Sequence, residues 1–97
     1  MQTKINSYVG FAIKSGKIKY GVENIIVQSK SCVILIDKTL SVGSKDKINV
    51  FAMKKNIKVY ETRIEDFYKD KNCKAIGIED KNLAMAIIKE MEENGEK

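Results

Sequence analysis

An apolar run at residues 32–36 constrains the fold of this chain more than any other feature. Its sequence, Cys32-Val33-Ile34-Leu35-Ile36, is apolar at both alternations and rich in β-branched side chains. This pattern is typical of a central strand that is covered on both faces. The rest of the chain therefore has to supply a layer of helices on each side and the neighbouring strands.

Helical and extended patterns alternate along the rest of the sequence. Apolar residues at helical spacing predict helices over residues 3–14, for about two turns from Gly21, over 45–55, over 64–68 and after Asp80. We expect Ser15-Gly16 to end the first helix, residues 41–44 to supply a turn and a cap before the third, and Asp80 to cap the last. Further strands are predicted at 17–20, 57–60 and 75–78. The alternation predicts an α/β fold, a three-layer α/β/α sandwich with a central mixed sheet of about four strands. The 97 residues suit a single domain spanning 1–97.

The composition argues against catalysis and metal binding. The chain has no histidine, the commonest general base, and its two cysteines, Cys32 and Cys73, lack metal-site spacing. We therefore expect reduced thiols, no metal, no cofactor, no catalytic residues and no small-molecule substrate. The longest apolar run has five residues, against the roughly 20 that span a bilayer. With no secretory signal pattern at the N-terminus, we expect a cytoplasmic protein without a membrane partner.

Positive charge is concentrated in the first 60 residues. They hold eleven lysines and three acidic residues, whereas residues 61–97 hold seven basic and ten acidic ones. This asymmetry indicates a basic face for a polyanion and an acidic final helix, although a lysine-rich composition also simply maintains solubility. A helix that starts at Gly21 would expose backbone N–H groups near Lys14, Lys17, Lys19 and Lys30, which favours a phosphate backbone as the ligand.

One local sequence is similar to a known family. The segment Tyr8-Val9-Gly10-Phe11-Ala12-Ile13-Lys14-Ser15-Gly16-Lys17-Ile18, followed by Gly21, resembles the opening of the bacterial YlxQ-type branch of the kink-turn RNA-binding ribosomal protein superfamily. The order of the predicted elements extends the resemblance over nearly the whole chain. It implies a ribosomal-type domain that binds RNA sharply bent at tandem sheared G·A pairs.

The resemblance also implies which residues contact RNA. Gly21 matches the glycine of the family's recognition phrase, whereas Glu23, Asn24 and Val27 stand where archaeal members have asparagine, glutamate and lysine. A second contact region falls near Asp37-Lys38, after the central strand, and near Glu61-Thr62-Arg63-Ile64, before the short helix. There, Arg63 suits a phosphate or a stacked base, and Ile64 suits an extruded nucleotide.

Two hypotheses follow from these observations. The first is a non-enzymatic, ribosome-associated protein that recognises kink-turn-like structured RNA, either ribosomal or another RNA. Its predicted RNA-binding residues are Lys14, Lys17, Lys19, Gly21, Glu23, Asn24, Lys30, Asp37, Lys38, Thr62, Arg63 and Ile64. The alternative is a protein–protein interaction module on the same fold that has lost specific RNA recognition, with Val27 and Ile64 as an exposed apolar contact.

Overall fold

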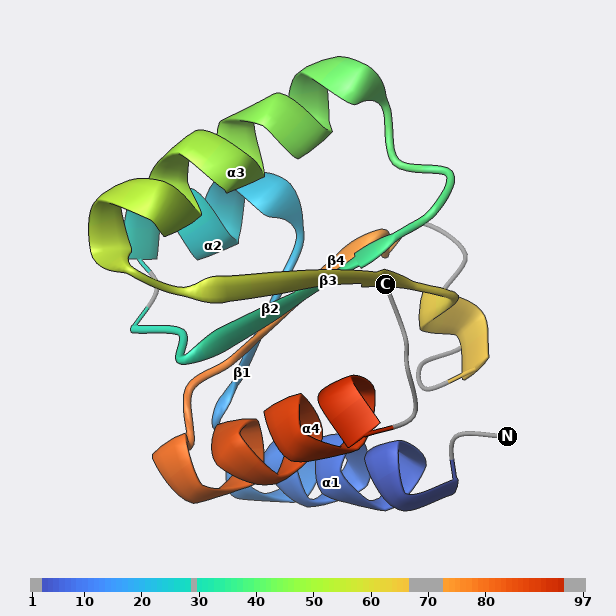
Figure 1. The fold of residues 1–97 in the computed structure, drawn as a ribbon. Coiled ribbons are helices and arrows are strands. Elements are labelled where there is room, and N and C mark those ends of the chain that lie inside the picture. The colour runs from blue at the N-terminus through green and yellow to red at the C-terminus, as the bar shows by residue number, and fades with distance from the viewer. Residues whose placement is uncertain (1–2, 29, 67–72, 94–97) are drawn as a thin grey trace.

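A four-stranded mixed sheet lies between two layers of helices in the computed structural model of the chain (Figure 1). The structure describes residues 3–28, 30–66 and 73–93. In chain order, the elements are α1 (Thr3–Ser15), β1 (Ile18–Tyr20), α2 (Val22–Gln28), β2 (Val33–Asp37), α3 (Val42–Lys55), β3 (Lys58–Thr62), the 3₁₀-helix η1 (Ile64–Asp66), β4 (Ala75–Ile78) and α4 (Lys81–Glu93). The predicted α/β/α sandwich is confirmed.

The strand order in the sheet is β1-β4-β2-β3. Strands β2 and β3 are parallel, and β4 is antiparallel to both of its neighbours, β1 and β2. Strands β1, β2 and β3 therefore all run in one direction. We call the end of the sheet where these three strands finish and β4 begins the carboxyl end, and the opposite end the amino end.

The sheet buries both of its faces. Helices α1 and α4 cover one face, and α2 and α3 cover the other (Figure 1). Val33 and Leu35 of β2 point into the first core, and Ile34 and Ile36 point into the second. All four side chains are at most 1% exposed, so β2 is the doubly covered strand that the apolar run predicts. Each such side chain contributes about 2 kcal/mol through burial.

Specific residues begin and end the helices. Gly16 has a left-handed φ of 73°, and the Lys17 N–H donates to the Ala12 carbonyl at 3.0 Å, which ends α1 as predicted. The Asp80 carboxylate accepts from the Leu83 N–H at 3.0 Å and caps α4, also as predicted. Among the described residues, no helix is long and apolar enough to cross a membrane.

Some element boundaries differ from the prediction. Helix α3 begins at Val42 rather than at residue 45, because the Ser41 hydroxyl accepts from the Ser44 N–H and caps the helix one turn earlier. Strand β3 ends at Thr62 rather than at residue 60, because the parallel pairing with β2 continues to Asp37. The predicted helix at 64–68 is a 3₁₀ turn over Ile64–Asp66, and residues 67–68 lie outside the described part.

Candidate functional site

Strand direction places part of the predicted site at the carboxyl end of the sheet. The backbone hydrogen bonds there connect residues that are far apart in the sequence. The Gly21 N–H donates to the Ala75 carbonyl at 2.9 Å, and the Asp37 N–H donates to the Lys74 carbonyl at 2.8 Å. On the other side of β2, the Lys38 N–H donates to the Thr62 carbonyl at 3.1 Å. Gly21, Lys38 and the segment after β3 therefore share this end of the molecule.

The other predicted lysines are not part of this group. The Lys17 carbonyl accepts from the Glu79 N–H at 2.8 Å, and the Lys30 N–H donates to the Glu79 carboxylate at 3.3 Å, so both residues lie at the amino end. Lys14 is in the last turn of α1, just before Lys17. Lys19 lies in β1, between the two ends. At about 3.3 Å per strand residue, the two ends are roughly 10–15 Å apart.

Gly21 opens α2, as the sequence predicts. Its φ of 90° lies in the left-handed region, and its carbonyl accepts the first helical bond, from the Ile25 N–H at 3.1 Å. Nothing lies within 4 Å of the position that a Cβ atom would take at Gly21, so another molecule can approach the backbone there. The glycine thus gives a tight turn and an open surface at the carboxyl end.

Glu23 and Asn24, the two residues at the recognition positions of α2, are held in different ways. The Asn24 side-chain amide donates to the Tyr20 carbonyl at 2.9 Å, which keeps it at the start of α2. The Glu23 carboxylate instead lies 3.5 Å from the Lys47 ammonium on α3. Only Asn24 is therefore held against the carboxyl end of β1, and Glu23 is directed towards α3.

Asp37 organises the loop that follows β2. One carboxylate oxygen accepts from the Thr39 N–H at 2.9 Å and also from the Thr39 hydroxyl, and the other accepts from the Ile64 N–H at 2.9 Å. The Lys74 ammonium donates to the Thr39 hydroxyl at 2.8 Å. Burial alone would raise the pKa of Asp37, but these hydrogen bonds and the Lys74 charge hold the pKa below its usual value. The carboxylate is therefore a structural acceptor within the chain.

A hollow of about 450 Å³ opens beside Asp37, and we call it the carboxyl-end hollow. It is lined by Asp37, Lys38, Thr39, Arg63, Glu65, Cys73 and Lys74, so three cationic side chains face two carboxylates. The exposed Arg63 guanidinium donates to Glu65 at 3.1 Å. Sequence reasoning missed Thr39, Glu65, Cys73 and Lys74. Cys73 and Lys74 come just before β4, and they lie where its neighbours end because β4 is antiparallel to them, a direction that the sequence does not show.

Two predicted contact residues are buried. Thr62 is 3% exposed at the end of β3, and Ile64 is 1% exposed within the core under α1 and α4. The hydrogen bond from the Ile64 N–H to Asp37 fixes the start of η1 with the isoleucine side chain turned inward. The prediction that the Ile64 side chain meets an extruded nucleotide is therefore wrong, and so is its placement on an exposed apolar contact. The Thr62 side chain is likewise not presented to a ligand.

Glu61, an acid next to the predicted phosphate contacts, has a partner inside the protein. Its carboxylate lies 3.4 Å from the Lys45 ammonium, which also donates to the Lys38 carbonyl at 3.1 Å. This pair reduces the unfavourable charge that Glu61 would otherwise present to a polyanion. Within the described ranges, no group of three or more His, Cys, Asp or Glu side chains gathers to hold a metal ion.

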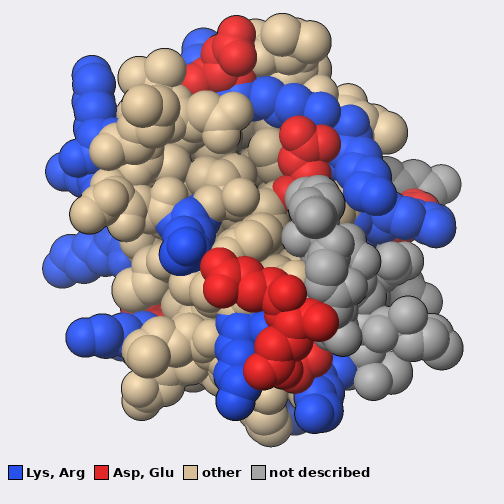
Figure 2. All heavy atoms as spheres, in the orientation of Figure 1, with Lys and Arg blue, Asp and Glu red and all other residues tan. Residues whose placement is uncertain are grey.

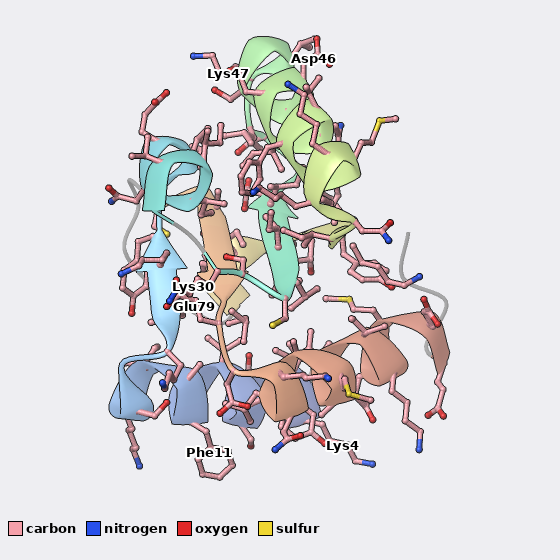
Figure 3. All side chains as sticks on the ribbon, turned by 90° about the vertical axis from the view of Figure 1, so that its left-hand side faces the viewer. Lys4, Phe11, Lys30, Asp46, Lys47 and Glu79 are labelled. Atoms are coloured by element: carbon pink, nitrogen blue, oxygen red, sulfur yellow. The ribbon has the colours of Figure 1, made fainter. Side chains whose placement is uncertain are left out.

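Charge is distributed unevenly over the surface. In Figure 2, basic side chains project along the left-hand margin, and acidic side chains gather in the lower centre, where Figure 1 draws the end of α4. Figure 3, which faces that margin, shows Lys30 and Glu79 next to each other. Glu79 partly offsets the positive charge at the amino end.

Comparison with known proteins gives a structural match and no family. No family model matches the chain, and no curated protein matches it. A solved structure described as a protein with unknown function from Bacillus halodurans is similar, with a TM-score of 0.80 and 14% sequence identity. The match covers 92% of this chain and 97% of that chain. At this identity, the likeness establishes the α/β fold alone.

Proposed function

We propose that this chain is a non-enzymatic, cytoplasmic, ribosome-associated protein that binds kink-turn-like structured RNA at the carboxyl end of its sheet. One observation carries the proposal. The segments beginning at Gly21, Lys38 and Arg63, which the family resemblance assigns to RNA, follow three different strands and meet at one end of the molecule. A single bent RNA could contact all three segments.

The carboxyl-end hollow offers cations for phosphate groups. Arg63 suits bidentate contact with a phosphate or stacking on a base, and Lys38 and Lys74 suit electrostatic contacts. Asp37 lies among them, so phosphates would bind at the rim rather than deep in the hollow. The rim therefore supplies affinity and orientation rather than sequence readout.

Asn24 is the side chain best placed to read a base edge. Its amide nitrogen already donates to Tyr20, so its carbonyl oxygen can accept from the amino or imino group of a guanine. The open backbone at Gly21 allows the RNA to approach this position closely. Glu23 contributes less to this readout, because it pairs with Lys47 on the α3 side.

The lysines outside the carboxyl end have a secondary role in the proposal. Lys14, Lys17 and Lys30 lie near the amino end, and Lys19 lies between the ends on β1, an edge strand. An RNA arm that runs along β1 would meet Lys19 first and the amino-end lysines further on. These contacts would add salt-dependent affinity without specificity.

The test compares two RNAs across a salt series. One is a kink-turn RNA, and the other is the same RNA with its G·A pairs replaced by Watson–Crick pairs. We expect tight binding to the first and much weaker binding to the second at every salt concentration. Equal binding with a steep salt dependence would instead mean a general basic surface, and no binding to either RNA would overturn the proposal.

The protein–protein alternative retains one observation in its favour. Val27 on α2 is 72% exposed, but Ile64, its expected partner in an apolar contact, is buried. The absorbance ratio at 260 and 280 nm of the purified protein separates the two functions, because co-purified RNA raises it. The ratio must be calibrated against nucleic-acid-free protein, since the chain contains no tryptophan.

A further inference from the structure

Helix α3 is apolar on its outer face as well as on its inner face. Ile48 and Ala52 are buried against the sheet, as expected of a helix that covers it. Three further apolar side chains project outward: Val42 is 74% exposed, Val50 53% and Met53 82%. Packing against the sheet explains the apolar residues on the inner face of α3. It does not explain the exposed apolar residues on the outer face.

Opposite charges flank Val50 at equal spacing along this outer face. Asp46 precedes it by four residues and Lys54 follows it by four, so the three side chains form one row with steps of about 6 Å along the axis. Asp46 and Lys54 are exposed, and neither forms an ion pair with another described residue. Figure 3 shows Asp46 and the neighbouring Lys47 at the end of α3 that lies far from α1 and α4.

The three residues of this row line one side of an open groove between α2 and α3. It encloses about 580 Å³, and Ile26, Val50 and Phe51 provide its apolar lining. The ion pair between Glu23 and Lys47 lies at the same groove. The Asp46–Val50–Lys54 row therefore borders an apolar surface that can be covered further.

We propose that two copies of this chain pair through α3 in an antiparallel, two-fold symmetric arrangement centred on Val50. Read in the reverse direction, the row acid-valine-lysine becomes lysine-valine-acid, so it is complementary to its own antiparallel copy. In the commonest class of helix packing, the i±4 rows of two helices lie side by side. Each Asp46 then lies next to the partner's Lys54, and the two Val50 side chains pack together, as an isologous interface requires.

The size of the surface sets the expected strength of the dimer. Helix α3 has 14 residues and is about 21 Å long, so a pair of such faces is at the small end of specific interfaces. Two exposed ion pairs add little to an interface of this kind. We therefore expect a dimer with a Kd on the order of 0.1 mM.

Sedimentation equilibrium of RNA-free protein over a concentration series tests the pairing. We expect the mass to rise from the 11.0 kDa of one chain towards twice that value. The single variants Asp46→Lys and Lys54→Asp should each weaken dimerisation at least fivefold, because in a two-fold dimer each substitution replaces both attractive pairs with like-charge pairs. Their combination should restore dimerisation, and a mixture of the two single variants should form a heterodimer in which both charge pairs are attractive.

Controls and contrary outcomes separate this surface from others. Lys81 is the matched control, because it lies in α4, on the other face of the sheet. Lys81→Asp changes the net charge by the same amount as Lys54→Asp and should leave the Kd of the dimer unchanged. Circular dichroism of every variant checks that the fold is retained. A protein that stays monomeric up to about 1 mM overturns the proposal, because Kd values of this order would be visible there. A dimer whose Kd does not change with the charge exchanges also overturns the proposal. If α3 instead binds a different protein, the double exchange would not restore that binding, and this result too would count against self-pairing.

Discussion

At the scale of single residues, Asp37 has the clearest structural role. It joins the end of β2 to the loop at Thr39 and to the start of η1 through three hydrogen bonds. A sequence cannot reveal this role, because the donor at Ile64 lies 27 positions away and comes close only when β3 pairs with β2. Asp37 was predicted to contact RNA. In the structure its carboxylate instead holds the loop after β2 and the start of η1 in place, next to the predicted contact residues Lys38 and Arg63.

Asp37→Asn should lower the free energy of unfolding by about 1–2 kcal/mol at neutral pH, because an amide nitrogen cannot accept the hydrogen bonds that one carboxylate oxygen accepts. The pKa of Asp37 is lowered in the folded state. Its contribution is therefore present above the unfolded pKa of about 3.9 and is lost as the pH falls through the lower folded pKa. Urea denaturation at neutral and acidic pH measures this difference between variant and wild type.

The exposed Asp46 supplies the matched control for this experiment. At low protein concentration, Asp46→Asn should change stability by less than about 0.5 kcal/mol at either pH. Equal destabilisation by the two substitutions would contradict the structural role of Asp37.

Gly77 is a second residue whose role is local. A Cβ atom there would occupy the space of the Ser31 hydroxyl and would lie 3.3 Å from Ile25. Glycine in this strand permits close packing of β4 against the segment before β2. The sequence alone indicates close packing or a bulge at such a glycine, and the structure identifies the former.

At the scale of elements, the end of α4 is attached to the edge strand β3. The Tyr60 hydroxyl donates to the Glu92 carboxylate at 2.8 Å, and the Lys58 ammonium lies 3.4 Å from the same carboxylate. Burial, the hydrogen bond to Glu92 and the Glu92 charge together raise the pKa of Tyr60 to about 12. This contact fixes the final turn of α4 to the sheet.

Ultraviolet titration of phenolate formation should therefore reveal one tyrosine that ionises near pH 12, well above the ordinary value of about 10. Because the folded pKa is the higher one, the stabilising contribution of Tyr60 is complete below about pH 10 and is lost as the pH rises towards 12. Glu92→Gln should move this ionisation to lower pH. Tyr60→Phe should remove it, and a late step that persists in that variant would assign it to another tyrosine.

The elements were largely predictable because their signals are local. Three predictions depend on only a few neighbouring residues each: that Gly16 ends α1, that Asp80 caps α4 and that β2 is buried on both faces. The structure confirms all three. The ends of β3 and the start of α3 were less accurately predicted. The length of β3 depends on its pairing with β2, and two serines, Ser41 and Ser44, were both plausible starts for α3.

At the scale of the whole molecule, strand order decides which predicted site residues lie at the same end of the sheet. The sequence supplies the basic residues but not their grouping, because the grouping depends on strand directions and on the insertion of β4 between β1 and β2. Lys17 and Gly21 are four positions apart and lie at opposite ends of β1. The burial of the Ile64 side chain could not be predicted either. A 3₁₀ turn of three residues is too short for a repeating apolar pattern to show which of its sides faces the core.

This division predicts a graded response of RNA binding to charge reversal. Lys38→Glu, at the carboxyl-end hollow, should weaken binding to a kink-turn RNA about tenfold and lower the salt slope by about one. Lys19→Glu should weaken it less, and Lys17→Glu at the amino end should have the smallest effect, although all three change the net charge equally. Fluorescence anisotropy over a salt series measures the affinities, and equal losses in all three variants would mean that binding is spread over the whole surface.

The position of β4 has a consequence for how the chain acquires its shape. Strands β2 and β3 are neighbours in sequence as well as in the sheet. Among the described strands, β1 pairs only with β4, which is made of residues 75–78. While the polypeptide is being synthesised, β1 emerges early. It has no strand to pair with until about three quarters of the chain has been made, because its partner β4 is made late. A nascent chain that stalls before residue 75 would present β1 as an unpaired edge, which is the form most open to wrong partners.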